Sequence, residues 1–215
     1  QSALAAASFF IVPRHVIGRG FTAPSDLFGL GFIGTGKQAR GLLNQFKKQP
    51  VRIVTGSDVD SRKLALFQSL AEKAYREASG TEPAGGFKAR ADFREVLADA
   101  SVDGVVIAMP DHWHAWAAVR AAEAGKHIYL EKPLTRTVAE GRAVVKAVDK
   151  HKVVLQTGSM QRSWKNFRTA CELVRNGYIG DVKEVLVHVG DPAIACDLAE
   201  EPKPSTLDWE GWVGP

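Results

Sequence analysis

The sequence predicts an α/β protein built on a doubly wound parallel sheet. From residue 28 to residue 156, short runs of β-branched and apolar residues alternate with segments of helical periodicity, which is the pattern of parallel strands joined by crossover helices. Six such strands within about 130 residues fit a single nucleotide-binding domain. The chain has 215 residues, so we expect this domain and part of a second one.

Each predicted strand is short, and the run Val102–Ala108 is almost continuously apolar, which suits a strand covered on both faces. Parallel strands of this kind need helices above and below the sheet. In chain order, the predicted strands are Phe28–Ile33, Val51–Thr55, Phe87–Ala89, Val102–Ala108, His127–Leu130 and Val153–Gln156.

The segments between these strands carry apolar residues at helical spacing, and helix breakers or capping residues mark several of their ends. Pro50 ends the first helix, Gly80 ends the second, and Thr137 forms a capping box with Glu140 at the start of the fifth. The predicted helices are Lys37–Gln49, Ser61–Ser79, Asp92–Leu97, His114–Ala124 and Thr137–Lys150.

After Thr157 the pattern changes, which indicates a second unit. Ser163 can cap a helix that ends at Asn176, and the alternation over Val182–Val189 predicts a strand. We therefore divide the chain into residues 1–27, a dinucleotide-binding domain over residues 28–158, and an incomplete α/β domain over residues 159–215. This last unit is represented by its first helix and strand.

The first 27 residues are predicted to be the remnant of an export signal followed by a linker. Residues 3–12 (ALAAASFFIV) form an apolar run with the length of a signal-peptide core, and Gly18–Ser25 is rich in Gly, Pro and small residues. The alternative is an apolar strand or helix that packs on the domain. We expect an exported protein whose sequence continues beyond both ends of this chain. No apolar run reaches the length of an integral membrane span.

Charge and composition exclude several classes of protein. The net charge is +4, and residues 31–155 carry 20 basic and 14 acidic side chains, which suits an anionic ligand but is too diffuse for a nucleic-acid surface. Two cysteines are too few for a disulfide scaffold, and no Cys/His spacing predicts structural zinc. Most of the charges are expected on solvated helix faces.

A G-x-G-x-x-A motif lies between the first strand and the first helix, where a Rossmann domain binds a dinucleotide. Gly34 permits the tight turn, Gly36 lets the backbone approach the pyrophosphate, and Ala39 lets the helix pack closely on the strand. Asp58 ends the second strand and is predicted to accept hydrogen bonds from ribose hydroxyls and to repel a 2′-phosphate. NAD is therefore the expected cofactor, with NADP as the alternative because Ser61–Lys63 contains two basic residues.

Two further segments follow strands at the carboxyl edge of the predicted sheet, where ligands bind in this fold. Residues 108–114 (AMPDHWH) follow the fourth strand, and the sequence Glu131-Lys132-Pro133 follows the fifth. The H-x-H spacing in the first segment lacks a third ligand, so we expect Trp113 and His114 to form a cofactor wall rather than a metal site. Lys132, taken alone, is expected to be a surface lysine.

The segments GFIGTGKQA, SDVD, AMPDHWH, AGKHIYLEKPLT and GSMQRS, in this order and spacing, resemble the Gfo/Idh/MocA family, which includes glucose–fructose oxidoreductase and inositol dehydrogenases. The resemblance covers residues 28–215. It implies a Rossmann domain that binds NAD or NADP, followed by a domain that holds substrate and contributes to a homo-oligomer. It also implies hydride transfer between the cofactor and a sugar, inositol or related polyol.

Carried over position by position, the resemblance implies that Lys132 is the catalytic lysine. The cofactor-binding residues that it implies, together with those derived above, are Gly34, Thr35, Gly36, Lys37, Gln38, Asp58, Met109, Pro110, Trp113, His114, Glu131, Lys132 and Gln161. Asp111 stands where many members have Asn. The catalytic Asp and His partners of the family have no counterpart before Pro215, so this chain alone is expected to be inactive.

Two other functions are consistent with the resemblance. An NAD-dependent glycosidase subgroup of the same family oxidises, eliminates and reduces again, without net production of NADH. A sensor that binds the dinucleotide without turnover is the third alternative, although it has no need of a positioned Lys132.

Overall fold

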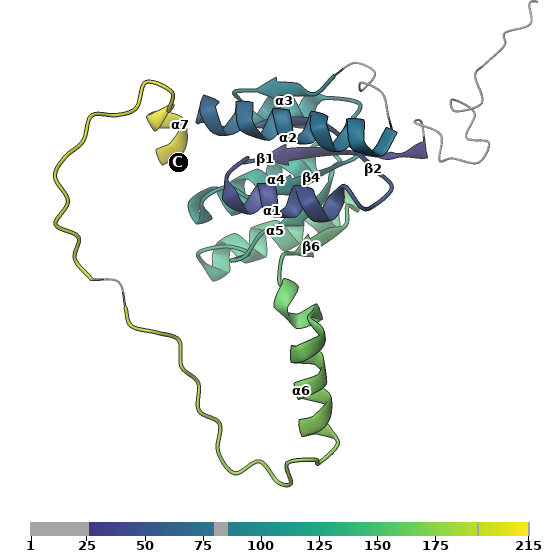
Figure 1. The fold of residues 1–215 in the computed structure, drawn as a ribbon, viewed down its shortest axis with the longest axis vertical. Coiled ribbons are helices and arrows are strands. Elements are labelled where there is room, and N and C mark those ends of the chain that lie inside the picture. Colours follow the sequence, from purple (N-terminus) through teal and green to yellow (C-terminus); the bar gives the residue numbers. More distant parts are fainter. Residues whose placement is uncertain (1–25, 80–85, 193, 215) are drawn as a thin grey trace, which may run out of the picture.

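The computed structural model describes residues 26–79, 86–192 and 194–214, and these contain a six-stranded parallel sheet with helices on both faces (Figure 1). The strand order is β3-β2-β1-β4-β5-β6. The strands are β1 (Phe28–Ile33), β2 (Val51–Ser57), β3 (Lys88–Arg90), β4 (Gly104–Ile107), β5 (His127–Leu130) and β6 (Leu155–Thr157). The predicted doubly wound fold is confirmed.

Five helices belong to this sheet, and two lie beyond it in sequence. They are α1 (Lys37–Phe46), α2 (Ser61–Ser79), α3 (Phe93–Ala98), α4 (His114–Glu123), α5 (Val138–His151), α6 (Lys165–Arg175) and α7 (Trp209–Val213). Single 3-10 turns, η2 (Asp111–Trp113) and η3 (Met160–Ser163), precede α4 and α6.

Two apolar cores cover the two faces of the sheet. Alternation along β4 divides its side chains between them, because Val105 and Ile107 pack with α3, α4 and α5, whereas Val106 packs with α1 and α2. Helix α4 approaches the sheet closely through four fully buried alanines (Ala117, Ala118, Ala121 and Ala122). The near-continuous apolar character of the central strands follows from this double cover.

The strand order reverses between β1 and β4, because the chain first winds outward to β3 and then returns to the other side of β1. The amide of Ala108 donates to the Ile33 carbonyl over 2.8 Å, so the ends of β1 and β4 stay side by side up to the loops. A ligand crevice forms outside strand ends at such a reversal.

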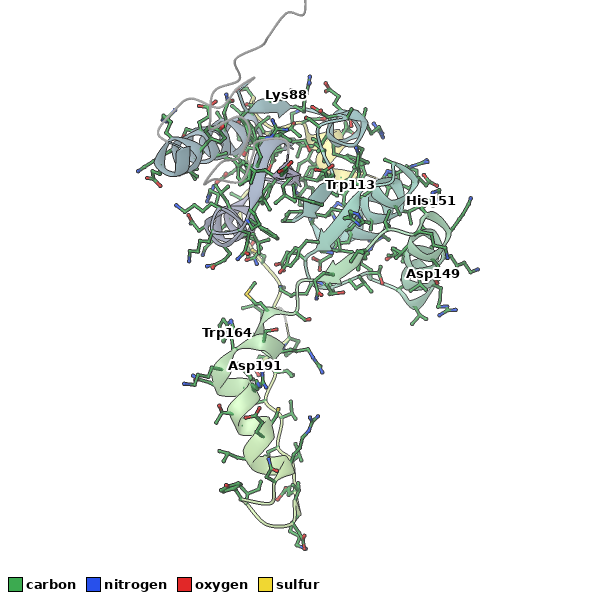
Figure 2. All side chains as sticks on the ribbon, turned by 90° about the vertical axis from the view of Figure 1, so that its right-hand side faces the viewer. Lys88, Trp113, Asp149, His151, Trp164 and Asp191 are labelled. Atoms are coloured by element: carbon green, nitrogen blue, oxygen red, sulfur yellow. The ribbon has the colours of Figure 1, made fainter. Side chains whose placement is uncertain are left out.

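The predicted strand over Val182–Val189 does not form. Residues 182–189 are exposed chain without secondary structure, and no described strand lies beside them to supply hydrogen bonds. Figure 1 shows α6 projecting away from the sheet and the following chain looping back to α7, and Trp164 precedes α6 in Figure 2. The predicted export-signal remnant lies, apart from its last two residues, outside the described part of the chain. None of the described helices is both long and apolar enough to cross a membrane.

A half-buried aspartate joins segments at the amino edge of the sheet. Asp99 follows α3 and accepts hydrogen bonds from Lys88 Nζ at 2.7 Å and from the Ser101 hydroxyl and amide at 2.6 and 2.9 Å. Lys126 Nζ donates to the Asp99 carbonyl over 3.0 Å. Burial alone raises the pKa of Asp99, but the bonds from Lys88 and Ser101 outweigh it, so the pKa lies well below the ordinary value.

Replacing this carboxylate is expected to destabilise the chain. Asp99→Asn should lower the free energy of unfolding at pH 7 by about 1–3 kcal/mol, because Lys88 loses a charge-assisted partner. Because the pKa of Asp99 is lower in the folded chain than in the unfolded chain, ionised Asp99 stabilises the fold at pH values above the unfolded pKa of about 3.9. This stabilisation is lost as the pH falls toward the folded-state pKa. Urea unfolding across pH 3–7 should therefore show the largest difference between the two proteins at pH 5–7.

Glu123→Gln is the matched control, because Glu123 pairs with Arg120 on the surface of α4 and such pairs contribute about 0–1 kcal/mol. Equal losses in the two variants, or a loss in Asp99→Asn that persists unchanged to pH 3, would contradict the assignment.

Candidate functional site

A cavity of about 270 Å³ opens at the carboxyl ends of β1, β2 and β4. It lies at the strand-order reversal, where the sequence predicted a ligand. Its lining is Gly34, Gly36, Lys37, Gln38, Ser57, Asp58, Val59, Lys63, Ala91, Phe93, Ala108, Met109, Pro110, Trp113, Gly211 and Trp212. The structure thus brings together eight of the residues predicted to bind the cofactor: Gly34, Gly36, Lys37, Gln38, Asp58, Met109, Pro110 and Trp113.

The glycine-rich loop requires glycine at its first position. Gly34 has φ +83°, and a Cβ there would lie 2.6 Å from the Ala108 carbonyl oxygen. Gly36 caps α1 in an extended conformation without a side-chain hydrogen bond, and a Cβ on it would meet no atom within 4 Å. The first amides of α1 have no helical acceptor, and the residues that carry them line the cavity, which is the arrangement in which helix ends bind anions.

Ser57 is a further indication that a polar ligand belongs in this cavity. It ends β2, lines the cavity and is 1% exposed. Its hydroxyl has no hydrogen-bond partner within the described residues. A buried hydroxyl costs free energy unless it is paired, so its orphaned state fits a site that a ligand completes.

Asp58 connects the end of β2 to the glycine-rich loop. Its Oδ2 accepts from the Thr35 amide at 2.7 Å and the Thr35 hydroxyl at 2.9 Å, and its Oδ1 accepts from the Asp60 amide at 2.9 Å. Thr35 itself is fully buried and does not line the cavity, so its contribution is to join the glycine-rich loop to Asp58. A carboxylate has about four acceptor positions, which leaves Asp58 capacity for a ribose hydroxyl.

The basic residues after Asp58 are already paired. Arg62 and Lys63 lie 3.3 and 3.8 Å from the carboxylate of Asp60, which is buried at the start of α2. Burial raises the pKa of Asp60, but hydrogen bonds and charge from Arg62, with the charge of Lys63, lower it further than burial raises it. Asp60 therefore offsets the positive charge that a 2′-phosphate would need.

His114 lies beneath the cavity and not in its wall. It is 1% exposed, and its Nδ1 and Nε2 face the carbonyl oxygens of Pro133 and Met109 at 2.5 and 3.0 Å. The predicted wall contact of His114 is thus corrected: its buried ring lies between carbonyl oxygens of the loop after β4 and the loop after β5. Trp113 alone of the pair lines the cavity. The described residues contain no group of side chains suited to a metal ion.

Glu131 and Lys132 directly follow β5, and they differ in exposure to solvent. Glu131 is 3% exposed and accepts from Gln38 Nε2 at 2.9 Å and from the Lys132 amide at 3.1 Å. Lys132 is exposed, and its ammonium has no partner among the described residues. Neither residue lines the 270 Å³ cavity, and exposed Gln161, in η3, does not line it either. The catalytic candidate is therefore separate from this cavity but is linked to it through Gln38, which lines the cavity and donates to Glu131.

Sequence reasoning missed two cavity residues at the far end of the chain. Gly211 and Trp212 belong to α7, which packs against the loops after β2 and β4. The spacing of Trp209 and Trp212 in an aromatic-rich terminal segment was a visible indication of a buried or ligand-facing role.

Comparisons with known proteins agree with this architecture. The family model described as "Oxidoreductase family, NAD-binding Rossmann fold" (GFO_IDH_MocA) matches residues 28–159. The chain is 34% identical over 160 residues to inositol 2-dehydrogenase 1 of Saccharopolyspora erythraea, covering 74% of this chain and 44% of that protein. It is 36% identical over 116 residues to glycosyl hydrolase family 109 protein 2 of Shewanella sp. (strain ANA-3), covering 54% of this chain and 25% of that protein.

A solved structure described as a probable dehydrogenase from Thermotoga maritima superposes with a TM-score of 0.60 at 27% identity, covering 71% of this chain and 42% of that one. The chain thus spans less than half the length of these relatives. The family match, however, includes every strand of the sheet, the glycine-rich loop and the loops that follow β2, β4 and β5. On that extent of agreement, the chain belongs to the Gfo/Idh/MocA family of oxidoreductases and carries its NAD-binding Rossmann fold.

Proposed function

We propose that this chain is the cofactor-binding half of an NAD-dependent oxidoreductase that acts on an inositol, a sugar or a related polyol. The observation that carries the proposal is the cavity formed by the glycine-rich loop, Asp58 and the orphaned Ser57 hydroxyl. The inositol dehydrogenase of Saccharopolyspora erythraea supports the choice of polyol, because it shares 34% identity over most of this chain. Export and homo-oligomer formation stay predictions.

The residues present fit a bound dinucleotide. The free amides at the start of α1 would hold the pyrophosphate, Asp58 would accept from a ribose hydroxyl, and Trp113 would form the wall. NAD supplies, when bound, a nicotinamide carbon that accepts or returns a hydride. The pairing of Lys63 and Arg62 with Asp60 favours NAD over NADP.

In this proposal Lys132 moves the proton. Oxidation of a substrate alcohol breaks a C–H bond and an O–H bond; the neutral amine of Lys132 would accept the hydroxyl proton, and the hydride would pass to the cofactor when NAD is bound. The backbone around Lys132 is held in place by its neighbours. The Glu131 carboxylate accepts a hydrogen bond from the Lys132 amide, and the His114 ring faces the Pro133 carbonyl. The exposed side chain of Lys132 is then free to reach a substrate held by the rest of the protein.

A second candidate is the NAD-dependent glycosidase reaction, which oxidises and later reduces the same sugar. The likeness to the glycosyl hydrolase family 109 protein of Shewanella favours it, at 36% identity over 116 residues. Incubating the full-length protein with NAD and candidate polyols separates the two, because only the dehydrogenase accumulates NADH with turnover.

The first test is the preference of the site for NAD over NADP. The chain should bind NAD more tightly than NADP. Asp58→Ser removes a charged acceptor, so it should weaken the binding of NAD about 10- to 100-fold and the binding of NADP by less. Titration calorimetry with both dinucleotides measures the two affinities. Asp149→Asn on the exposed side of α5 is the control and should change neither (Figure 2). Tighter binding of NADP to the unaltered chain would defeat the claim.

The second test is the role of Lys132. In the full-length protein, Lys132→Ala should lower kcat by about 100- to 10,000-fold and leave the Kd of NAD within a few-fold. Lys150→Ala, at the exposed end of α5, should leave both unchanged. Turnover near the original value would overturn the assignment, and a selective loss of NAD binding would make Lys132 a cofactor contact instead.

A further inference from the structure

The segment Thr206–Gly214, here called the clasp, returns to the nucleotide-binding domain after a long exposed stretch (Figure 1). Its first half is fastened to the chain just after β2. The Asp208 amide donates to the Val59 carbonyl over 2.9 Å, and the Ser61 amide donates to the Thr206 carbonyl over 3.0 Å. The clasp therefore begins as an antiparallel addition beside Asp58, the ribose-binding candidate.

Its second half is fastened to the loop after β4. The Trp212 carbonyl lies 2.8 Å from His112 Nε2 and accepts from Trp113 Nε1 at 3.2 Å. The rings of His112 and Trp212 meet edge to face at 5.4 Å. Gly214 packs so closely on Trp113 that a Cβ would lie 2.5 Å from the indole ring. Figure 2 shows Trp113 beside the yellow clasp.

These two attachments place the clasp across the dinucleotide cavity. Gly211 and Trp212 line it together with Gly34, Asp58 and Phe93. Trp209 stacks on Trp212 at 5.1 Å with an interplanar angle of 12°, which keeps a flat aromatic pair at this edge. A second cavity of about 460 Å³ adjoins it, and Trp113 and Gly211 line both, so the clasp borders a space larger than 270 Å³.

The clasp is reached by an exposed segment. Trp209 and Trp212 are 44% and 37% exposed, so both rings keep part of their surface in solvent while the clasp is docked. The chain that leads to the clasp is exposed and without secondary structure over residues 181–192 and 194–204. Segments with few buried contacts open locally at low cost.

We propose that the clasp is the outer wall of the NAD site, in which Trp212 contacts the adenosine half of the cofactor and slows its release. The inference rests on the proposed NAD binding and adds a contact from outside the Rossmann domain. Aromatic rings stack on nucleobases with useful strength in other proteins, and Val59 and Phe93 add apolar lining to the same cavity.

The test measures cofactor binding in the full chain. Trp212→Ala should raise the Kd of NAD about 5- to 150-fold, which is the effect of losing one base–aromatic stack, and stopped-flow release of NADH should become faster by a similar factor. Trp212→Phe should recover most of the affinity. His112→Ala, which removes an anchor outside the cavity, should speed release with a smaller change in Kd. Trp164→Ala, an exposed tryptophan before α6, is the control and should change neither (Figure 2).

Hydrogen exchange gives a readout that a loss of fold does not imitate. Saturating NAD should slow exchange of the Asp208 and Ser61 amides, which form the first attachment. If the unaltered chain binds NAD but Trp212→Ala and His112→Ala leave Kd and release unchanged, the clasp proposal fails. If the unaltered chain binds no NAD, the proposed function fails. If Trp212→Ala does not fold, the proposal is tested by Trp212→Phe, His112→Ala and the exchange data instead.

Discussion

The close approach of the glycine-rich loop to the end of β4 is the constraint on which the rest of the site depends. Gly34 has a positive φ and lies where a Cβ would meet the Ala108 carbonyl, while its amide donates to the Ser57 carbonyl over 2.9 Å. One residue therefore holds the ends of β1, β2 and β4 in register. The cavity, the free end of α1 and the anchor for Asp58 all follow from that junction.

The sheet could be predicted because its pattern is local. Strands covered on both faces are apolar throughout, and helices with one buried face repeat at helical spacing, so β4 and α1 were recognisable without knowledge of their neighbours. The alternation over Val182–Val189 looked equally convincing, yet a strand also needs a partner that supplies hydrogen bonds. Alternation reveals a preference for extended structure and says nothing about whether a partner is present.

The site was predictable to the extent that its residues follow strand ends. Gly34, Asp58 and Trp113 reach the cavity for that reason. The partners that redirect a side chain were not predictable: His114 follows β4 as expected, but two carbonyl groups from separate loops turn it inward. The contact between the clasp and the loop after β4 was not predictable either, because 100 positions separate His112 from Trp212.

Glu131 explains how a lysine outside the cavity remains coupled to the cofactor site. Its buried carboxylate accepts from Gln38 in the first turn of α1 and from the Lys132 amide. Burial and the negative charge of Glu131 raise the pKa of Tyr129, two positions earlier on β5. A Cβ on Gly158 would lie 2.9 Å from the Glu131 carboxylate, so the end of β6 closes over it. The helix end suited to the pyrophosphate and the backbone of the proton-transfer candidate are thus held by one carboxylate.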